Sequence, residues 1–220
     1  MSVSGRTVTK GRMAVFTIMA ILLIDQAVKI WVKTHMTLHE TIAVTDWFKI
    51  CFIENNGMAY GMEIGSKLAL SLFRIVAICL IGYYLRLQVR CGARAGYIIC
   101  LALIVAGAAG NILDCMFYGL VFSASSDYYT AYFVPFGTGY SSFLTGKVVD
   151  MLYFPLINGV WPEWMPFVGG EDFIFFSPVF NIADSSISVG VILLLLFFRK
   201  ELGHLTLRKE PKTVTPNEAS

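Results

Sequence analysis

Charged residues are scarce in this chain of 220 residues. Asp, Glu, Lys and Arg together make up 15% of the sequence, and hydrophobic residues make up 56%. A soluble domain has about 25% charged residues and about 45–50% apolar residues. The apolar residues here also occur in long blocks instead of being spread along the chain. This composition excludes an ordinary soluble domain and predicts a membrane protein.

The sequence patterns of metal sites, disulfide frameworks and common hydrolases are also missing. The five cysteines include no CxxC pair and are odd in number, and the three histidines have no acid at metal-ligand spacing. Neither GxSxG nor HExxH occurs. We therefore expect no metal ion and no cofactor. Any hydrolytic chemistry then has to come from carboxylates.

Four apolar segments are long enough to cross a membrane, which takes about 20 helical residues. They run over about 13–31, 68–85, 96–113 and 180–198. We interpret them as four transmembrane helices of a single membrane-embedded domain that covers residues 1–220. The fold class is therefore an all-α membrane protein.

Lysine and arginine are distributed unevenly between the two sides of these helices. Three regions are basic: the one before the first helix, the one between the second and third, and the one after the fourth. By the positive-inside rule these regions and both termini are cytoplasmic. Outer segments of about 34–67 and 119–178 then lie on the opposite side. The polar tail of about 209–220 is expected to be disordered.

The outer segments contain signals of strands. Residues 41–62 alternate between apolar and polar positions and include an Asn-Asn-Gly turn signal. Residues 120–178 are rich in Tyr, Phe, Trp, Gly and Pro, which suit the membrane interface. We expect a small β-rich cradle or lid on the outer membrane face.

Polar residues of all four predicted helices fall at one depth, near the outer face. They are Asp25, Lys29, Arg74, Asn111, Asp114, Asn181 and Asp184. A charge inside the hydrocarbon costs several kcal/mol, about 2.5 to 3.5 on insertion scales, and such residues usually mark a functional site. Simpler roles are a structural ion pair of Asp25 with Lys29 four residues later, and helix capping by Asn181.

The chemical candidates among these and the outer segments are three carboxylates: Asp114, Asp150 and Asp184. Two carboxylates held close together share a proton, because they do not both ionise easily. Such a pair can deprotonate a water molecule and protonate a peptide group. Spacing alone does not decide which two aspartates pair.

Six blocks of the chain resemble the lipoprotein signal peptidases, also called signal peptidase II, which are membrane aspartyl proteases of bacteria. The blocks are LIDQAVK, ENNGMAYG, the region of Arg74, GAAGNILD, KVVDMLYF and FNIADSSISVG. They occur in the order found in that family and cover most of the chain except the tail and parts of the outer segments.

The resemblance implies a catalytic pair formed by Asp150 and Asp184. Residues that support the site or contact substrate are then Asp25, Asn55, Gly57, Asn111, Asp114 and Asn181, with Lys29 and Arg74 as further members. It also implies a fold of four membrane helices with an outer strand cradle.

The activity that the resemblance implies is removal of the signal peptide from lipid-modified prolipoproteins, with cleavage before the diacylglyceryl-cysteine. Globomycin inhibits the family. The implied location is the bacterial cytoplasmic (inner) membrane, with the active site near the outer, periplasmic face. Partners are the prolipoprotein substrates and membrane lipids, with no nucleic acid, and a monomer suffices.

Two features depart from the family pattern. Cys115 stands where the family has an arginine after GNxxD, so that a fixed donor near the substrate is missing, or Arg74 or Lys29 substitutes for it. The segment between Asp114 and Asp150 is also longer than in typical members.

Two other functions fit the residues alone. One is a proton-coupled transporter with Asp25, Lys29, Arg74 and Asp184 as a relay, although polar residues at one level form no path across a bilayer. The other is a lipid-binding scaffold without enzymatic activity.

Overall fold

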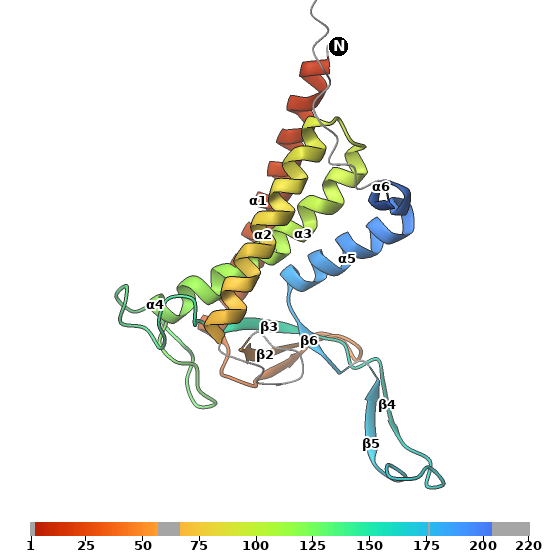
Figure 1. Ribbon diagram of the computed structural model, residues 1–220. Helices are drawn as coiled ribbons and strands as arrows, with labels where there is room; N and C mark the ends of the chain where they lie inside the picture. The colour runs from red at the N-terminus through yellow and green to blue at the C-terminus, as the bar shows by residue number, and fades with distance from the viewer. Residues whose placement is uncertain (1–2, 57–66, 176, 204–220) are drawn as a thin grey trace, which may run out of the picture.

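The computed structural model describes residues 3–56, 67–175 and 177–203, and the predicted tail and Gly57 fall outside these ranges. Its helices are α1 (Val3–His35), α2 (Lys67–Arg90), α3 (Ala95–Leu113), η2 (Asp114–Tyr118), α4 (Gly119–Val121), α5 (Ile182–Phe197) and α6 (Arg199–Gly203). Figure 1 shows the long helices side by side, with the strands gathered at one end of them.

Three helices in the described part of the chain are long and apolar enough to cross a membrane. They cover Val8–His35, Lys67–Arg90 and Ala95–Val121, and so include the first three predicted spans. The apolar helix α5 is shorter, with 16 residues. Many large apolar side chains on these helices face outward, among them Phe16 at 74% exposure and Phe73 at 70%. Outward apolar side chains of this kind are expected where helices face lipid.

The third predicted helix continues beyond its expected end at residue 113. The helical backbone runs on through η2, a π-helical turn, and then through α4 to Val121. The α-helix itself ends at Leu113, the predicted end, and Asp114 is its C-cap. Asn111 and Asp114 are both buried, at the junction of α3 with the π-helical turn. Turns of π-helix inside α-helices are often found at functional sites.

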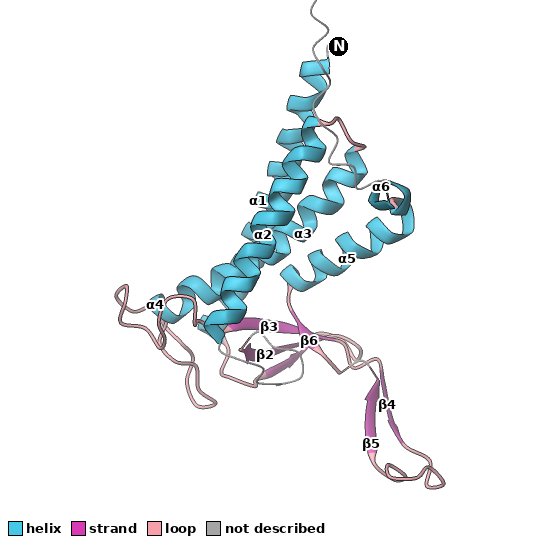
Figure 2. Cartoon of the chain, viewed as in Figure 1, coloured by secondary structure: helices cyan, strands magenta, loops and turns pink. Residues whose placement is uncertain are grey.

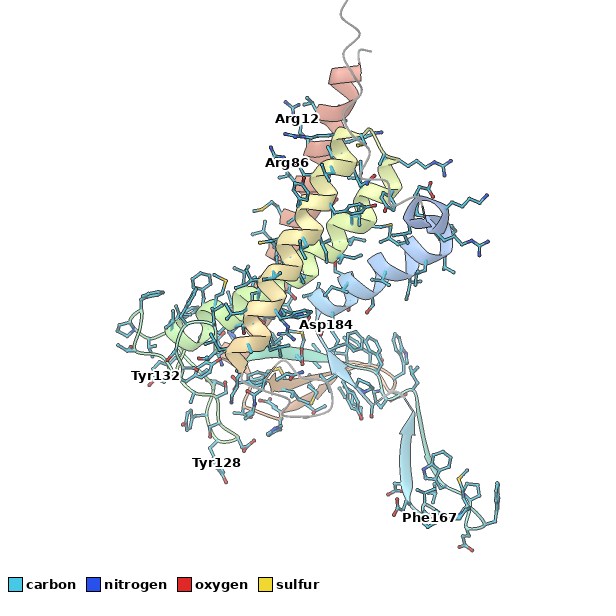
Figure 3. All side chains as sticks on the ribbon, viewed as in Figure 1. Arg12, Arg86, Tyr128, Tyr132, Phe167 and Asp184 are labelled. Atoms are coloured by element: carbon cyan, nitrogen blue, oxygen red, sulfur yellow. The ribbon has the colours of Figure 1, made fainter. Side chains whose placement is uncertain are left out.

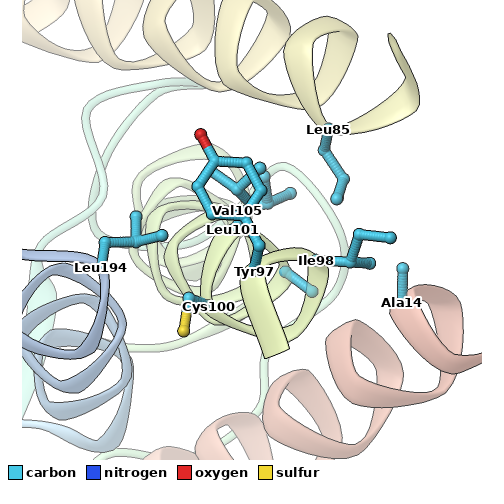
Figure 4. Close-up of a cluster of buried hydrophobic side chains, with 9 residues drawn as sticks. Ala14, Leu85, Tyr97, Ile98, Cys100, Leu101, Val105 and Leu194 are labelled. Atoms are coloured by element: carbon cyan, nitrogen blue, oxygen red, sulfur yellow. The ribbon is translucent and has the colours of Figure 1, made fainter. Parts of the chain in front are cut away.

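Helix α3 is the centre of the bundle. Buried residues make up 67% of its span, against 17% for that of α1 and 11% for that of α2. Helices α1, α2 and α5 all contact it. Figure 4 shows Tyr97, Leu101 and Val105 of α3 surrounded by Ala14, Leu85 and Leu194 of the other three helices.

Glycines allow α3 and α5 to approach closely. A β-carbon on Gly107 would lie 2.2 Å from the carbonyl oxygen of Ala183, and one on Gly110 would lie 3.2 Å from the β-carbon of Ala183. Small residues bring helix backbones together in membranes. This contact brings the start of α5 against the polar part of α3.

The strands form two small antiparallel sheets, which confirms the predicted β-rich element. One sheet has the order β1 (Thr41–Ala43), β2 (Lys49–Asn55), β3 (Val148–Tyr153) and β6 (Val179–Phe180), and the other pairs β4 (Ile157–Val160) with β5 (Asp172–Phe175). Figure 2 shows helices and strands in separate parts of the molecule, with the β4–β5 hairpin projecting away. The larger sheet lies against the ends of the helices and supplies one wall of the site.

Candidate active site

Three elements bring the polar residues together at the junction of the helices and the larger sheet. Strand β3 carries Asp150, which is 3% exposed and pairs with Ile53 of β2 in the sheet register. Strand β6 leads directly to Asn181 and α5, so Asp184 lies in the first turn of that helix. Helix α3 contributes Asn111. Figure 3 labels Asp184 at this junction.

Asn181 begins helix α5 and also contacts Asp150. Its extended backbone is that of an N-cap, and its side-chain Oδ1 accepts a hydrogen bond from the backbone N–H of Asp184 at 2.9 Å. The capping role expected from the sequence is therefore confirmed. With Oδ1 occupied in this way, the amide Nδ2 points to other partners.

Two asparagine amides connect Asp150 to Asp184. Asn181 Nδ2 donates to Asp150 Oδ1 at 2.7 Å and to Asn111 Oδ1 at 3.1 Å. Asn111 Nδ2 in turn donates to Asp184 Oδ1 at 2.7 Å. These contacts orient one oxygen of each carboxylate. All the donors in this set of contacts are neutral amides, and none is a cation.

Asp150 has a second amide partner on the opposite side. Asn55 Nδ2 of β2 donates to Asp150 Oδ2 at 3.1 Å. Burial and then the nearby charge of Asp184 raise the pKa of Asp150 to about 7, against the hydrogen bonds from Asn55 and Asn181, which lower it. Asp150 therefore gains and loses its proton near neutral pH.

A buried ion cluster adjoins this pair. Lys29 Nζ lies 3.0 Å from Asp25 Oδ2 and 2.8 Å from Asp114 Oδ2, and all three side chains are fully buried. The predicted pairing of Asp25 with Lys29 is thus confirmed. Lys29 also donates to Asn111 Oδ1 at 2.9 Å, which joins the ion cluster to the amide bridge.

The two remaining acids have structural partners. Asp25 Oδ1 accepts from the backbone N–H of Ala183 at 2.9 Å, and so satisfies a free amide in the first turn of α5. Asp114 Oδ2 accepts from the backbone N–H of Val149 at 3.3 Å, next to Asp150. The geometry therefore separates Asp150 and Asp184, joined through amides, from Asp25 and Asp114, joined through a lysine. Spacing in the sequence had left this open.

Arg74 reaches the position next to Asp114. Its Nη1 lies 3.8 Å from Cys115 Sγ, so its guanidinium approaches the residue that departs from the family pattern. Gly57 lies outside the described residues. Within the described part of the chain, no group of three His, Cys, Asp or Glu side chains is arranged to hold a metal ion.

Gln26 belongs to the site and was not singled out from the sequence. Its Nε2 donates to Asp114 Oδ1 at 2.8 Å and to Asp25 Oδ2 at 3.2 Å, and its Oε1 accepts from the Tyr118 hydroxyl at 3.2 Å. The available signal was an amide between two charged residues of an apolar helix, in IDQAVK. Lys33 and Glu54, which form a buried ion pair beside the site, were also not singled out from the sequence.

Comparisons with known proteins identify the family of this chain. The family Signal peptidase (SPase) II matches residues 17–199. A protein named lipoprotein signal peptidase from Porphyromonas gingivalis is 50% identical over 197 residues, which cover 89% of this chain and 87% of that protein. Another of the same name from Amoebophilus asiaticus is 34% identical and covers 90% of this chain and 82% of its own length. The chain belongs to the signal peptidase II family and is a peptidase.

Solved structures share the fold. Two structures, both titled as a bacterial membrane enzyme determined by the in meso method, have TM-scores of 0.58 and 0.56 at 22% identity. The first match covers 90% of this chain and 94% of that chain. Together with the apolar helices, the family identifies a multi-pass membrane protein.

Proposed function

We propose that this chain removes the signal peptide from diacylglyceryl-modified prolipoproteins and cuts on the N-terminal side of the lipidated cysteine. The observation that carries the proposal is the pair of carboxylates, Asp150 and Asp184, joined through two asparagine amides. The relatives named lipoprotein signal peptidase support the substrate class.

In the proposed reaction the two acids divide the proton transfers. One carboxylate takes a proton from a water molecule, whose oxygen attacks the carbonyl carbon of the scissile peptide bond. The other acid donates a proton to the carbonyl oxygen, and a proton passes to the leaving amine as the C–N bond breaks. A pKa of about 7 for Asp150 suits this exchange, because both protonation states are populated at neutral pH.

The amides of Asn55, Asn111 and Asn181 are proposed to hold the two carboxylates in the orientation needed for these transfers. Neutral donors orient an acid without fixing its charge as strongly as a cation does. The proposed supporting roles of Asp25, Lys29 and Asp114 are to fix α1, α3 and α5 around the pair. Arg74 and Gly57 are proposed to contact substrate, with Arg74 in place of the arginine missing at Cys115.

The proposed membrane placement has four spans, with α5 as the fourth, and both termini on the cytoplasmic side. Helix α5 is about 24 Å long at 1.5 Å per residue, and Arg199 and Lys200 follow it. Figure 3 shows Arg12 and Arg86 at the end of the helices away from Asp184. By the positive-inside rule this supports an active site near the outer face of the inner membrane.

The remaining parts of the proposal follow from the same site. One chain contributes Asp150 and Asp184 together with the Asn55, Asn111 and Asn181 amides that contact them, which supports a single domain acting as a monomer. The outward apolar side chains of the helices support contact with membrane lipids. Membership of the family supports inhibition by globomycin. The transporter alternative is not supported, because the family and the relatives are peptidases.

Replacement of either acid tests the proposal. Asp150→Asn and Asp184→Asn are each expected to abolish cleavage of a diacylglyceryl-modified test prolipoprotein by the purified enzyme in detergent, with the fold retained. Asp114→Asn is the comparison, since Asp114 contacts Lys29 instead of the amide bridge, and it is expected to keep measurable turnover. Cleavage by Asp150→Asn or Asp184→Asn at the rate of the unmodified enzyme would show that the pair is not catalytic.

A further inference from the structure

A second buried ion pair lies beside the proposed active site and takes no part in the amide bridge. Lys33 of α1 contacts Glu54 Oε1 of β2, and their side chains are 0% and 3% exposed. Ser125 Oγ donates to the same Glu54 oxygen at 2.7 Å and accepts from Lys33 Nζ at 2.9 Å. Lys147 Nζ contacts the other oxygen, Glu54 Oε2, at 3.0 Å. Both oxygens of Glu54 are therefore held.

Residues of the long outer segment enclose this pair. Lys33 Nζ lies 5.4 Å from the ring centroid of Phe122 and 4.9 Å from that of Tyr140, which are favourable cation–π positions. The Tyr140 hydroxyl also accepts from the backbone N–H of Lys147 at 2.7 Å. The outer segment between Asp114 and Asp150 thus covers the buried carboxylate of Glu54.

Glu54 is ionised in this enclosure. Burial alone raises the pKa of Glu54, but the charge of Lys33 and the hydrogen bonds from Lys33, Ser125 and Lys147 outweigh burial and hold it below its usual value. The pair therefore fixes β2 through charge-assisted contacts, which are stronger than neutral hydrogen bonds.

The register of the sheet connects Glu54 to the site. Glu54 is paired with Val149, and Asn55 is paired with Val148. Successive side chains of a strand point to opposite faces, so Glu54 faces Lys33 while Asn55 faces the other way and donates to Asp150 Oδ2. Asn55 is the last residue of β2, and Glu54 fixes the backbone immediately before it.

We propose that Glu54 is a positioning residue for the cleavage reaction, and that its contacts with Lys33, Ser125 and Lys147 hold the Asn55 amide against Asp150. This inference rests on the proposed catalytic role of Asp150. It gives the long outer segment a function at the active site, because that segment contributes Ser125, Tyr140 and Lys147.

A double-mutant cycle with Glu54→Gln and Asn55→Ala tests the proposal. Each single variant is expected to lower kcat about tenfold, which corresponds to the weakening of one hydrogen bond to a charged group. The double variant is expected to be no slower than Asn55→Ala, because Glu54 acts through Asn55. The readout is cleavage of a diacylglyceryl-modified test prolipoprotein by the full-length enzyme in detergent.

The pH profile separates positioning from general support of the fold. The Asn55 hydrogen bond favours the Asp150 carboxylate, so weakening it moves the corresponding limb of the kcat/KM profile to higher pH in both single variants. If Glu54 only supported the fold, Glu54→Gln would lower the amount of folded enzyme but leave the limb of the pH profile in place. Its effect on kcat would then add fully to that of Asn55→Ala in the double variant. An unmoved limb or full additivity therefore overturns the proposal.

Two further variants complete the experiment. Ser125→Ala removes one neutral donor to Glu54 without leaving a buried charge unpaired, and it is expected to shift the same limb in the same direction by less. If Glu54→Gln does not fold, Ser125→Ala tests the proposal in its place. An unmoved limb of the pH profile in Ser125→Ala then overturns the proposal. Glu201→Gln is the matched control, because it breaks the exposed pair of Glu201 with Arg94 and is expected to change nothing.

The result for Asp150→Asn keeps the two proposals apart. An inactive Asp150→Asn enzyme together with additive effects of Glu54→Gln and Asn55→Ala overturns only the role of Glu54. An active Asp150→Asn enzyme overturns the proposed catalytic pair, and with it the premise on which the role of Glu54 rests.

Discussion

Two groups of buried carboxylates meet in this protein, and their partners differ. Asp25 and Asp114 contact the ammonium group of Lys29. Asp150 and Asp184 receive hydrogen bonds from neutral amides instead. A neighbouring cation favours the ionised form of an acid more strongly than a neutral amide does. Aspartate is thus the partner of a buried lysine in the first group, and in the second group it is proposed to transfer protons.

The largest effect is expected from removal of the cation in the first group. Lys29→Met leaves two buried carboxylates without their partner, and breaking a buried ion pair costs about 3–5 kcal/mol. We expect a large fall in the free energy of unfolding, measured by thermal or denaturant unfolding in detergent. Lys10→Met, which removes contacts to the carbonyl oxygens of Gly92 and Ala93, serves as the lysine control and is expected to cost far less. Equal losses in the two variants would show that the cluster does not stabilise the fold.

For the second group we expect an effect on stability that depends on pH. The pKa of Asp150 is raised to about 7 from its ordinary 3.8, so between these values the folded protein holds a proton that the unfolded chain has lost. The contribution of Asp150 to stability therefore falls as pH rises from about 4 to about 7 and changes no further above that. Asp150→Asn lacks this group, so its stability relative to the unmodified protein is expected to rise across that range by up to about 4 kcal/mol.

Unfolding of both proteins at about pH 5 and about pH 8 measures this difference. A gap between the two proteins that is the same at both pH values contradicts the prediction. It would mean that Asp150 titrates alike in the folded and unfolded chain, and that the contrast with the Lys29 cluster does not exist.

A smaller effect is expected where both groups depend on the same helix contact. In Gly107→Ala the new β-carbon meets the backbone oxygen of Ala183 at 2.2 Å, so α5 has to move away from α3. Overpacking of this kind costs about 1–3 kcal/mol. We expect lower stability and slower cleavage, because Ala183 binds Asp25 and precedes Asp184. Gly82→Ala on α2, where nothing lies within 4 Å, is the matched control and is expected to be neutral or slightly stabilising. Similar results for both variants would rule out close packing as the reason.

Much of the fold was predictable because hydropathy and short-range spacing carry it. Apolar runs gave the long helices, and Asp25 with Lys29 gave an ion pair within one helical turn. The continuation of the helical backbone from α3 through η2 and α4 was not predicted, because burial of Asn111 and Asp114 depends on other helices. Four spans and the catalytic roles of Asp150 and Asp184 remain predictions.

The contacts that spacing could not predict join residues far apart in the chain. Glu54 meets Ser125 at a separation of 71 residues, and Asn55 meets Asp150 at 95. Lys33 lies just beyond the predicted first helix and Glu54 just before the Asn-Asn-Gly turn signal, and no local pattern predicts that either is buried. Only the sheet register and the folded outer segment show that the two residues form a buried pair next to the site.

The bond from the Ala183 backbone to Asp25 has a consequence for biosynthesis. It joins the first and the last long helix of the chain across 158 residues. The ribosome delivers α1 long before α5, and Asn181 and Asp184 arrive with α5. The set of partners around Asp150, which includes Asn181, is therefore complete only after the start of α5 has been synthesised. A nascent chain that lacks α5 cannot form the proposed active site.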